Sequence, residues 1–565
     1  TKRKAKEARK TPQYNKLLGL ELRLRVRLER KEKPSVDRAT AVNNLKEQIR
    51  EEHKRLKPAS GQNAWKRMQS EELMTKTFFR KFRNKNANAN ITELHQVEDW
   101  DNPETGGTTQ DDDQLEMEAT KYYKWLYQKK TTCPEAARDL LDMLRDDPIP
   151  PHIADESDTP IGLKHVLQAI RASGTGKSPG PDGLPSEIYK TYEDLLAPIL
   201  SETIQRSYDA GILPDTMQEG EVALIYKKKD PKDIRNYRPI TLLNNDYKIL
   251  ARVLTEKIKG VCEAAISNQQ KGFVPGRQIT DLIRQMHLVQ EYVNAKDMTG
   301  VVLLLDMEKA FDRCSWDFLK NSLEAIGVGP RMRKWVDMIY SERNPPKRSL
   351  RINGQTGRKF VLGSGVAQGC PLSPLLFLFI GEPLTRAIDT DEEYEGIKIG
   401  NTEHRALQFA DDTAAMAKDW DQIPKLMNII KKWENATAMR ANRAKTAIIP
   451  IGRTARLKDT DAHRPPTRML EELGLPGPST ERWEIYLGAP IASDVTAYKE
   501  FLEHKYRKIK QKLAGWKGLR GHTAHGRTMI ANSLIFSQMR YWVQLLHVPK
   551  EIHEWIKRDS QALLW

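Results

Sequence analysis

The run VVLLL at residues 301–305, followed directly by Asp306, constrains the fold more than any other feature of the sequence. Five consecutive apolar residues of this kind are typical of a strand that is buried on both faces. An ionised carboxylate at the end of such a strand is costly to bury unless it is paired or binds a metal. The run therefore predicts a central strand with Asp306 at its end as a candidate metal ligand.

A second acidic feature follows about a hundred residues later, where LQFADDTAAM at 407–416 places Asp411 and Asp412 between two short apolar segments. This pattern predicts a hairpin with both aspartates at its tip. Adjacent like charges repel, and a divalent cation relieves the repulsion. If the hairpin lies beside strand 301–305, three carboxylates converge on two Mg²⁺ ions, an arrangement suited to phosphoryl transfer. Taken singly these signals are weak, because Asp-Asp is usually a turn and an acid after a strand is often a helix cap.

The charge is unevenly distributed along the 565 residues, whose net charge is +16. Residues 1–90 hold 26 Lys and Arg against 10 Asp and Glu, whereas residues 91–160 hold 6 against 18. A basic arm and a basic body favour a polyanionic partner such as nucleic acid, although solvated helical faces would also explain the charge. No apolar run is long enough to predict a membrane span. The four cysteines lack the paired spacing of a zinc site or a disulfide framework.

The coarse organisation predicts a basic helical nucleic-acid-binding extension at 1–90 and an acidic linker with a helical connector at 91–160. Within these, 84–114 is predicted as a flexible linker, and the aromatic residues at 122–127 are predicted to pack. From about 161, short strands alternate with helices. The predicted strands are 222–226, 301–305, 348–352, 407–410 and 447–451, and the predicted helices are 282–293, 316–326, 332–340 and 375–388. The chain begins at Thr1 and stops inside a predicted helix, so we expect it to be a segment of a longer product.

A series of motifs between residues 170 and 545 resembles, in order, the reverse transcriptases of non-LTR (LINE-type) retrotransposons. The motifs are GKSPGPDGL at 176–184, VALIYKKKD at 222–230, NYRPITL at 236–242, NQQKGFVPGR at 268–277, LDMEKAFDR at 305–313, GVAQGCPLSP at 365–374, FADD at 409–412, NRAKT at 442–446, YLG at 486–488 and WKGL with GR and Ile530 at 516–530. The order of the motifs makes the resemblance specific.

The resemblance implies an α+β right-hand polymerase, with fingers and an antiparallel palm sheet at 161–490 and a thumb at 491–565 that is truncated at its C-terminus. It implies an RNA-directed DNA polymerase that extends a DNA 3′-OH on an RNA template, in target-primed reverse transcription. The implied partners are template RNA, a DNA primer or nicked target DNA, and deoxynucleoside triphosphates. A nuclear location, with a cytoplasmic ribonucleoprotein, follows from the family's use of genomic DNA, and KRKAK at 2–6 is a candidate import signal.

The resemblance also assigns roles to single residues. Asp306, Asp411 and Asp412 would hold two Mg²⁺ ions, for which Mn²⁺ is an expected substitute, with Asp412 more peripheral. Met307 would offer its backbone carbonyl. Phe311 would lie beneath the sugar and exclude a 2′-hydroxyl. The other implied residues are Arg238 and Lys227 for the triphosphate, with Lys228 and Lys229 as alternatives to the lysine, Gln368 and Gly369 for the nucleotide pocket, and Lys445 as a general acid.

Three alternatives remain at this stage. A group II intron-like reverse transcriptase is disfavoured by the motif at 516–530. A domesticated, non-catalytic nucleic-acid-binding scaffold predicts loss of the aspartates, yet all three are present. A viral RNA polymerase is disfavoured by Phe311. The sequence shows no endonuclease, zinc-knuckle or ribonuclease H signature, and it leaves the oligomeric state open.

Overall fold

The computed structural model describes residues 90–565 except 458–459, 461–463, 495, 518–523 and 565, together with Asn44 and Gln48. The chain divides into two compact units. The larger unit comprises residues 87–507 and 539–553 and contains every predicted site residue. The smaller unit includes 508–538 and 554–565. The predicted basic extension, with its KRKAK run, lies almost wholly outside the described residues.

A four-stranded sheet forms the centre of the larger unit, and all of its neighbouring strands are antiparallel. Its order is β11–β12–β5–β13, with bounds β11 (Ala406–Phe409), β12 (Asp412–Ala417), β5 (Thr299–Leu305) and β13 (Ala447–Gly452). The predicted strands at 301–305, 407–410 and 447–451 are therefore confirmed, and so is the predicted antiparallel sheet.

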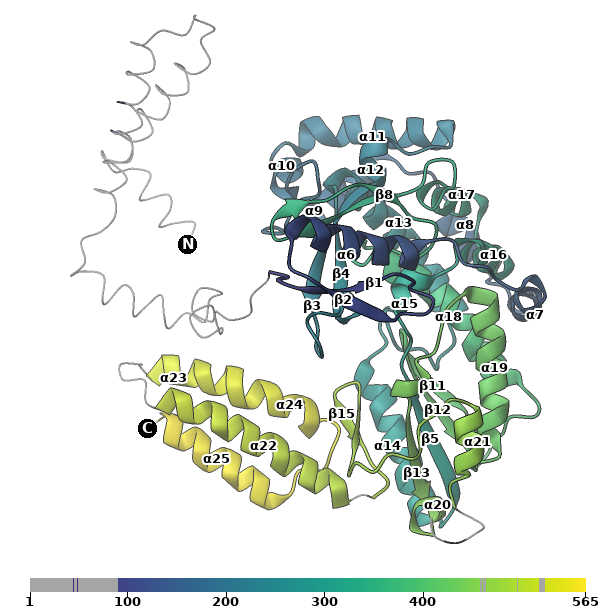
Figure 1. Cartoon of the computed structure of the whole chain (residues 1–565), viewed down its shortest axis with the longest axis vertical. Coiled ribbons are helices and arrows are strands. Elements are labelled where there is room, and N and C mark those ends of the chain that lie inside the picture. The colour runs from purple at the N-terminus through teal and green to yellow at the C-terminus, as the bar shows by residue number, and fades with distance from the viewer. Residues whose placement is uncertain are drawn as a thin grey trace, which may run out of the picture. The chain divides into compact units, whose positions relative to one another are not determined.

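Strand β5 is buried on both faces, as its apolar run predicts. Val301, Leu303 and Leu305 belong to one hydrophobic cluster, whereas Val302 and Leu304 belong to another. The first cluster includes residues of α18 (Ser373–Thr390) and α19 (Gln422–Thr437), and the second includes residues of α14 (Ile279–Ala295). Figure 1 shows α14 and α19 on opposite sides of the sheet. Alternate side chains of one strand therefore pack against different helices, which fixes the position of its last residue.

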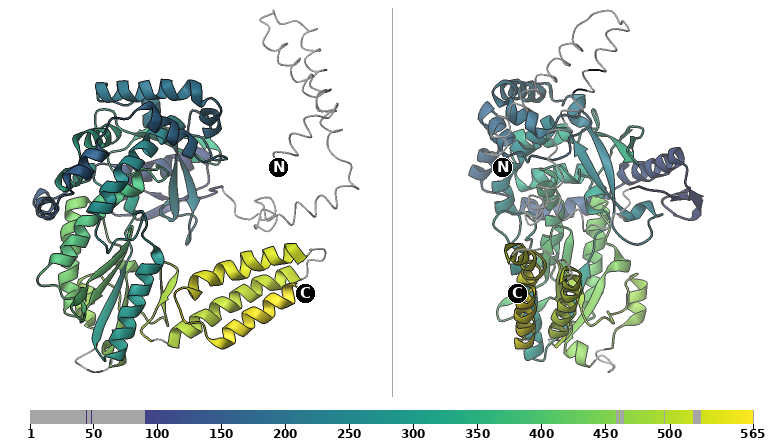
Figure 2. Two further views of the ribbon diagram at one scale, coloured as in Figure 1. Left: turned by 180° about the vertical axis from the view of Figure 1, so that it is seen from behind. Right: turned by 90° about the vertical axis from the view of Figure 1, so that its left-hand side faces the viewer.

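A second sheet, visible in Figure 2, includes two of the motifs that precede β5 in the sequence, those at 222–230 and 236–242. Its strands are β4 (Tyr237–Leu243), β3 (Glu219–Tyr226), β6 (Lys347–Ile352), β7 (Gln355–Thr356) and β8 (Phe360–Val361). Strand β3 is antiparallel to β4 and parallel to β6. The predicted strands at 222–226 and 348–352 are confirmed, and so is the predicted α+β class of the fold.

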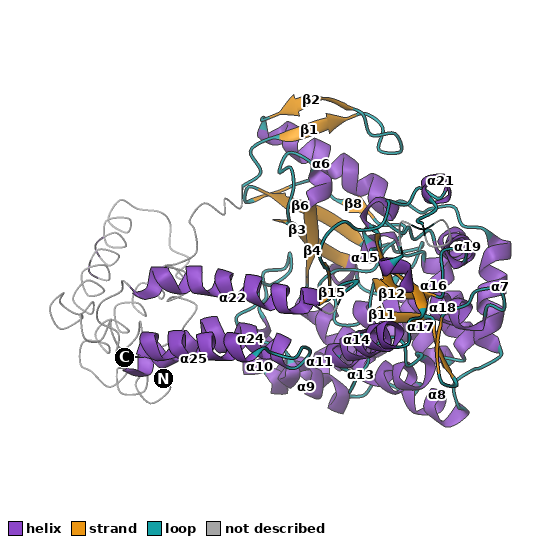
Figure 3. Cartoon of the chain, turned by 90° about the horizontal axis from the view of Figure 1, so that it is seen from below, coloured by secondary structure: helices purple, strands orange, loops and turns teal. Residues whose placement is uncertain are grey.

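The predicted flexible linker at 84–114 is wrong for the residues that the structure describes. Strands β1 (Leu94–Val97) and β2 (Thr105–Thr109) form an antiparallel hairpin. Figure 3 shows this hairpin against α6 (Asp112–Tyr127), where the ring of Trp100 lies 4.7 Å from that of Tyr122. The Gly, Thr and Asn residues of this stretch are typical of loops, but a few buried apolar residues hold it in place. The predicted packing of the aromatic cluster is confirmed, because Tyr122 is buried.

The four predicted helices are confirmed to within a few residues at their ends. The helices of the larger unit not yet named are α7 (Pro134–Arg145), α8 (Pro151–Ser157), α9 (Leu163–Ala172), α10 (Ser186–Thr191), α11 (Glu193–Ala210), α12 (Asp215–Gln218), α13 (Asn245–Ala265), α15 (Ala310–Arg313), α16 (Trp316–Ile326), α17 (Pro330–Ile339), α20 (Arg453–Arg456) and α21 (Thr467–Glu472). The larger unit also contains two short antiparallel hairpins. They are β9 (Ile397–Ile399) with β10 (Thr402–His404), and β14 (Glu484–Tyr486) with β15 (Ala489–Ile491).

The C-terminal segment is helical, as predicted. It contains α22 (Thr496–Lys517), α23 (Ala524–Ala531), α24 (Ser537–Val543) and α25 (Lys550–Leu564). Helix α22 is amphipathic, because Ile509 and Leu513 are buried whereas Arg507, Lys508 and Lys510 are exposed. Among the helices that the structure describes, none is long and apolar enough to cross a membrane.

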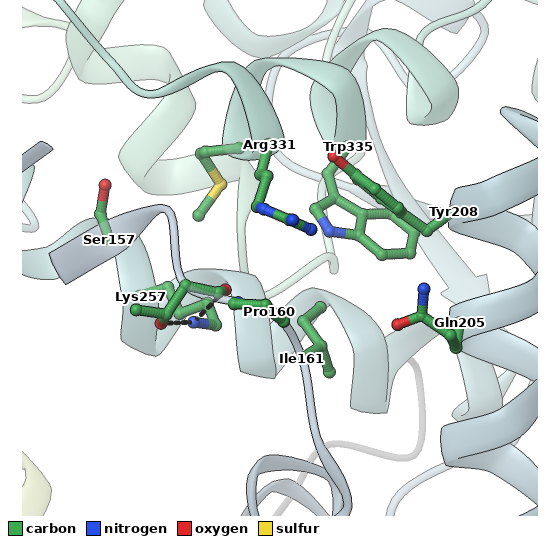
Figure 4. Close-up of a pocket in the computed structure, with 10 residues that line it drawn as sticks. Ser157, Pro160, Ile161, Gln205, Tyr208, Lys257, Arg331 and Trp335 are labelled. Carbon is green, nitrogen blue, oxygen red and sulfur yellow. Dashed lines mark hydrogen bonds between the residues drawn. The ribbon is translucent and has the colours of Figure 1, made fainter. Parts of the chain in front are cut away.

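A small hollow between α8, α11, α13 and α17 is part of the packing rather than a ligand site (Figure 4). It offers about 10 Å³ of space, no more than a single water molecule needs. Polar groups that line it already form a hydrogen bond with each other, since Lys257 Nζ donates to the Thr159 carbonyl at 2.7 Å.

Candidate active site

The three predicted aspartates come together at one end of the four-stranded sheet. The last paired residues of β5 and β12 are Leu305 and Thr413, so Asp306 and Asp412 are the next residues along two neighbouring strands. Phe409 pairs with Asp412 across the hairpin, which leaves Ala410 and Asp411 as its two-residue turn. The predicted hairpin tip is therefore shifted by one residue, because Asp412 is the first residue of β12.

Burial and repulsion between carboxylates both disfavour ionised side chains at this end of the sheet. Burial raises the pKa of Asp411, and the Asp306 carboxylate raises it further. Burial likewise raises the pKa of Asp412 to about 6, with Asp411 and Asp306 as the next causes. Lys445 offsets part of this charge, because its Nζ lies 3.2 Å from Asp306 Oδ2. The arrangement is one in which added positive charge would be stabilising.

The oxygen atoms at this site fit a divalent cation whose coordination shell a substrate would complete. Within the described residues, no group of three or more His, Cys, Asp or Glu side chains is placed so that it could hold a metal ion. Mg²⁺ commonly takes one or two carboxylates and completes its shell with substrate phosphates and water. Met307 fits as a further donor, since the hydrogen bonds on either side of it, from Asn442 N to Asp306 O and from Glu308 N to Arg440 O, do not use its carbonyl oxygen. Carboxylates that repel one another, rather than a finished cage, are the evidence for this site.

Phe311 is held between aromatic rings near the end of β5. Its ring stacks on Phe377 of α18, with centroids 5.0 Å apart and planes 9° apart. The exposed ring of Phe273 meets it edge-on at 6.4 Å. Phe311 is itself only partly buried. The contacts give the ring a defined orientation with one part left accessible.

Gln368 and Gly369 are fixed against β4. The N–H of Thr241 donates to the Gln368 carbonyl at 2.7 Å. Gly369 has a φ of 127°, and a Cβ there would lie 2.4 Å from the Thr241 carbonyl oxygen. Only glycine allows this approach. The Gln368 side chain donates from Nε2 to the Asp312 carboxylate at 3.1 Å, which directs the amide.

Lys227 and Arg238 lie on or next to β3 and β4, and both side chains are exposed. The charge of Lys227 lowers the pKa of both Asp411 and Asp412, and that of Arg238 lowers the pKa of Asp411. Of the lysine triplet at 227–229, the first is therefore the one whose charge acts on both aspartates. The structure thus brings Lys227, Arg238 and Lys445 into the electrostatic surroundings of the aspartates.

Gln270 is a positioning residue that the motif reasoning missed. It is 2% exposed, and its Oε1 accepts hydrogen bonds at 2.7 Å from the backbone N–H groups of Ala410 and Gly272. Its Nε2 donates to the Ala410 carbonyl at 3.2 Å. Ala410 has a φ of 57° and immediately precedes Asp411. One side-chain amide therefore holds the strained turn that carries the aspartates.

Replacing Gln270 with methionine is expected to raise the Mg²⁺ concentration for half-maximal primer extension by roughly 10- to 100-fold, because supporting residues of this kind orient metal ligands. The measurement is a Mg²⁺ titration of the extension rate. Gln290→Met is the matched control, since Gln290 is equally buried and donates to the Ala492 carbonyl at 3.0 Å elsewhere. An equal shift in both variants would show that Gln270 contributes only to folding.

Asp312 is buried beneath this site and links three segments. Its carboxylate accepts hydrogen bonds from the Tyr127 hydroxyl at 2.7 Å and from Gln368 Nε2. Burial raises the pKa of Asp312 to about 6, and Lys309 opposes that rise. The orientation of Gln368 therefore depends on a carboxyl group that is costly to ionise.

The raised pKa of Asp312 predicts a pH-dependent contribution to stability. Between about pH 4 and pH 6 the folded protein holds a proton that the unfolded chain has lost, so this contribution declines as the pH rises through that window. Asp312→Asn removes the titration. Its free energy of unfolding, relative to wild type, should therefore rise by roughly 2 kcal/mol from pH 4 to pH 7. Urea unfolding at both pH values measures this, and a difference that stays constant with pH would contradict it.

Comparison with known proteins identifies the domain that carries this geometry. Residues 226–475 match the family described as reverse transcriptase (RNA-dependent DNA polymerase). The matched range contains Asp306, Asp411 and Asp412. The chain carries a reverse transcriptase domain. This confirms the resemblance drawn from the motifs.

The relatives of this reverse transcriptase domain are proteins of transposable elements. A transposon TX1 protein of Xenopus laevis is 28% identical over 82% of the chain. The type-2 element R2DM of Drosophila melanogaster is 28% identical over 45% of the chain, and the polymerase of the mobile element jockey from the same fly is 24% identical over 51%. The chain spans 34% of the TX1 protein, 23% of the R2DM polyprotein and 31% of the jockey polymerase.

Proposed function

We propose that this protein is an RNA-directed DNA polymerase that extends a DNA 3′-hydroxyl on an RNA template. The observation that carries the proposal is the convergence of Asp306, Asp411 and Asp412 at the end of the four-stranded sheet, within a reverse transcriptase domain. A non-catalytic scaffold would have no need to retain three carboxylates that repel one another. The family names of the relatives favour a retrotransposon enzyme over one of the group II intron type.

The carboxylates of Asp306, Asp411 and Asp412, with the Met307 carbonyl, would hold two Mg²⁺ ions. Bound there, the ions would lower the pKa of the primer hydroxyl and offset the charge of the triphosphate. Arg238 and Lys227 would attract the triphosphate to this end of the sheet. Lys445, beside Asp306, would give a proton to the departing pyrophosphate.

The nucleotide pocket would lie between Phe311 and the Gln368–Gly369 turn. Phe311 would pack under the deoxyribose and leave no space for a 2′-hydroxyl. Gln368, whose side chain is oriented by its hydrogen bond to Asp312, would line the pocket from the loop that precedes α18. The four-stranded sheet would then be the palm, the sheet of β3, β4 and β6 part of the fingers, and α22 to α25 the thumb.

The biological reaction we propose is target-primed reverse transcription, in which the primer is the 3′ end of a nicked genomic DNA strand. The exposed cations of α22 would contact the backbone of the template–primer duplex. The proposed location is the nucleus, with a cytoplasmic ribonucleoprotein stage.

Primer extension tests this proposal. Purified protein is given a DNA primer annealed to an RNA template, the four deoxynucleoside triphosphates and Mg²⁺. We expect full-length DNA that requires the RNA template and is lost when EDTA removes the metal. Absence of extension on RNA, under conditions where the protein binds the duplex, would contradict the proposal.

A further inference from the structure

A basic hollow lies beside the active site and has no role in the proposed reaction. It measures about 680 Å³ and is formed by residues 130–133, the end of α15, the end of α19 and the segment that follows α19. The charged residues that line it are Lys130, Arg313, Glu434, Arg440 and Arg443. It therefore contains four cationic side chains and one anionic side chain.

Among the described residues, an ion pair neutralises only one of these cations. Arg443 Nη2 lies 2.9 Å from Glu434 Oε2. Within the part of the chain that the structure describes, Lys130, Arg313 and Arg440 have no carboxylate at ion-pair distance. Burial lowers the pKa of Lys130 to about 8; the charges of Arg313 and Arg440 lower it further, and the charge of Asp101 opposes them. The hollow therefore keeps an excess of positive charge.

The guanidinium groups also retain unused hydrogen-bond donors. Arg313 is 3% exposed, and its Nη1 has no hydrogen-bond partner among the described residues. Arg443 Nε is buried without a partner in the same way. Both donors are inaccessible to solvent, so they add positive charge beside the hollow without themselves facing it. Guanidinium groups suit the oxygen atoms of phosphate in particular.

The hollow is connected to the candidate metal site through a single loop. Arg440 and Arg443 flank Ala441 and Asn442. The backbone of these two residues pairs with the backbone of Asp306 and Met307, at the candidate metal site. Ala441 forms a β-bridge with Met307, and the Asn442 N–H donates to the Asp306 carbonyl at 2.7 Å. A ligand in the hollow would therefore contact the same loop that supports Asp306.

We propose that this hollow is a binding site for a phosphate group, held by Lys130, Arg313 and Arg440. The ligand is either the pyrophosphate that DNA synthesis releases or a backbone phosphate of the nucleic acid. The identity of these two phosphate sources rests on the proposed function, whereas the binding of phosphate in the hollow does not.

The test is calorimetric titration of the full chain with sodium pyrophosphate in EDTA, so that no metal can bind pyrophosphate at the aspartates. The double variant Lys130→Gln/Arg440→Gln should bind at least about tenfold more weakly than wild type, because charged hydrogen bonds are lost. The control Lys124→Gln/Arg138→Gln removes the same charge from exposed residues that do not line the hollow. Thermal unfolding of each variant confirms that it is folded.

Absence of pyrophosphate binding to wild type, or an equal loss of affinity in both double variants, would overturn the proposal. A second titration includes single-stranded RNA. Displacement of pyrophosphate by RNA would support a backbone phosphate as the ligand, whereas simultaneous binding would support free pyrophosphate. Because these measurements do not use catalysis, they stay informative even if primer extension fails.

Discussion

Replacing Asp411 with asparagine is expected to lower the rate of primer extension on RNA by at least about 10³-fold. Asparagine preserves the size of the side chain but removes the negative charge that would hold a cation. The turn of Ala410 and Asp411 is fixed by Gln270, so the effect should arise from lost charge rather than from altered geometry. The affinity for the RNA template should change little, since exposed cations elsewhere are expected to bind the backbone.

The control for this variant is Asp194→Asn, which removes one exposed carboxylate from α11. Its extension rate should stay within about twofold of wild type, as is usual for surface substitutions. Single-turnover extension with saturating Mg²⁺ and RNA–DNA duplex measures both variants. Extension by Asp411→Asn at the wild-type rate would exclude Asp411 from the metal site.

Replacing Phe311 with valine is expected to raise ribonucleotide incorporation, relative to deoxyribonucleotide incorporation, by about 10- to 100-fold. The ring is stacked flat on Phe377 and contacted on another side by Phe273, so it cannot easily move aside for a hydroxyl group. Valine would leave space at this position. Competing incorporation of a ribonucleotide and a deoxyribonucleotide opposite one template base measures the ratio.

Phe311→Tyr is the matched control for the same position, since it keeps the ring and its stacking partner. Its selectivity should remain close to that of wild type. If valine and tyrosine give the same selectivity as phenylalanine, Phe311 has a packing role and another residue distinguishes the sugars. A loss of all synthesis only in the valine variant would also contradict the assigned role.

The sequence was sufficient to predict the central strand and the meeting of the aspartates. The VVLLL run is apolar at every position because its alternate side chains enter two different clusters. That local signal, combined with the doubled acid of the hairpin, identified the end of the sheet. The motif order supplied the family, and the comparison confirmed it.

Contacts between distant segments were beyond sequence reasoning. Gln270 is 140 residues from Ala410, and no pattern in a single sequence reveals that its amide bonds to that turn. The hairpin of β1 and β2 was mistaken for a linker, because its glycines and threonines resemble a loop and its stability comes from packing on α6. The basic hollow likewise combines residues from 130–133, 313 and 434–443, whose proximity only the fold creates.

The most direct test of the central claim is Mn²⁺ binding, followed by electron paramagnetic resonance, to the protein on an RNA template with a chain-terminated DNA primer and the next deoxynucleoside triphosphate. We predict two bound ions in wild type and in Asp194→Asn. Asp306→Asn and Asp411→Asn should each lose binding of at least one ion. Unchanged Mn²⁺ stoichiometry and affinity in both of these variants would contradict the assignment of Asp306 and Asp411 as metal ligands.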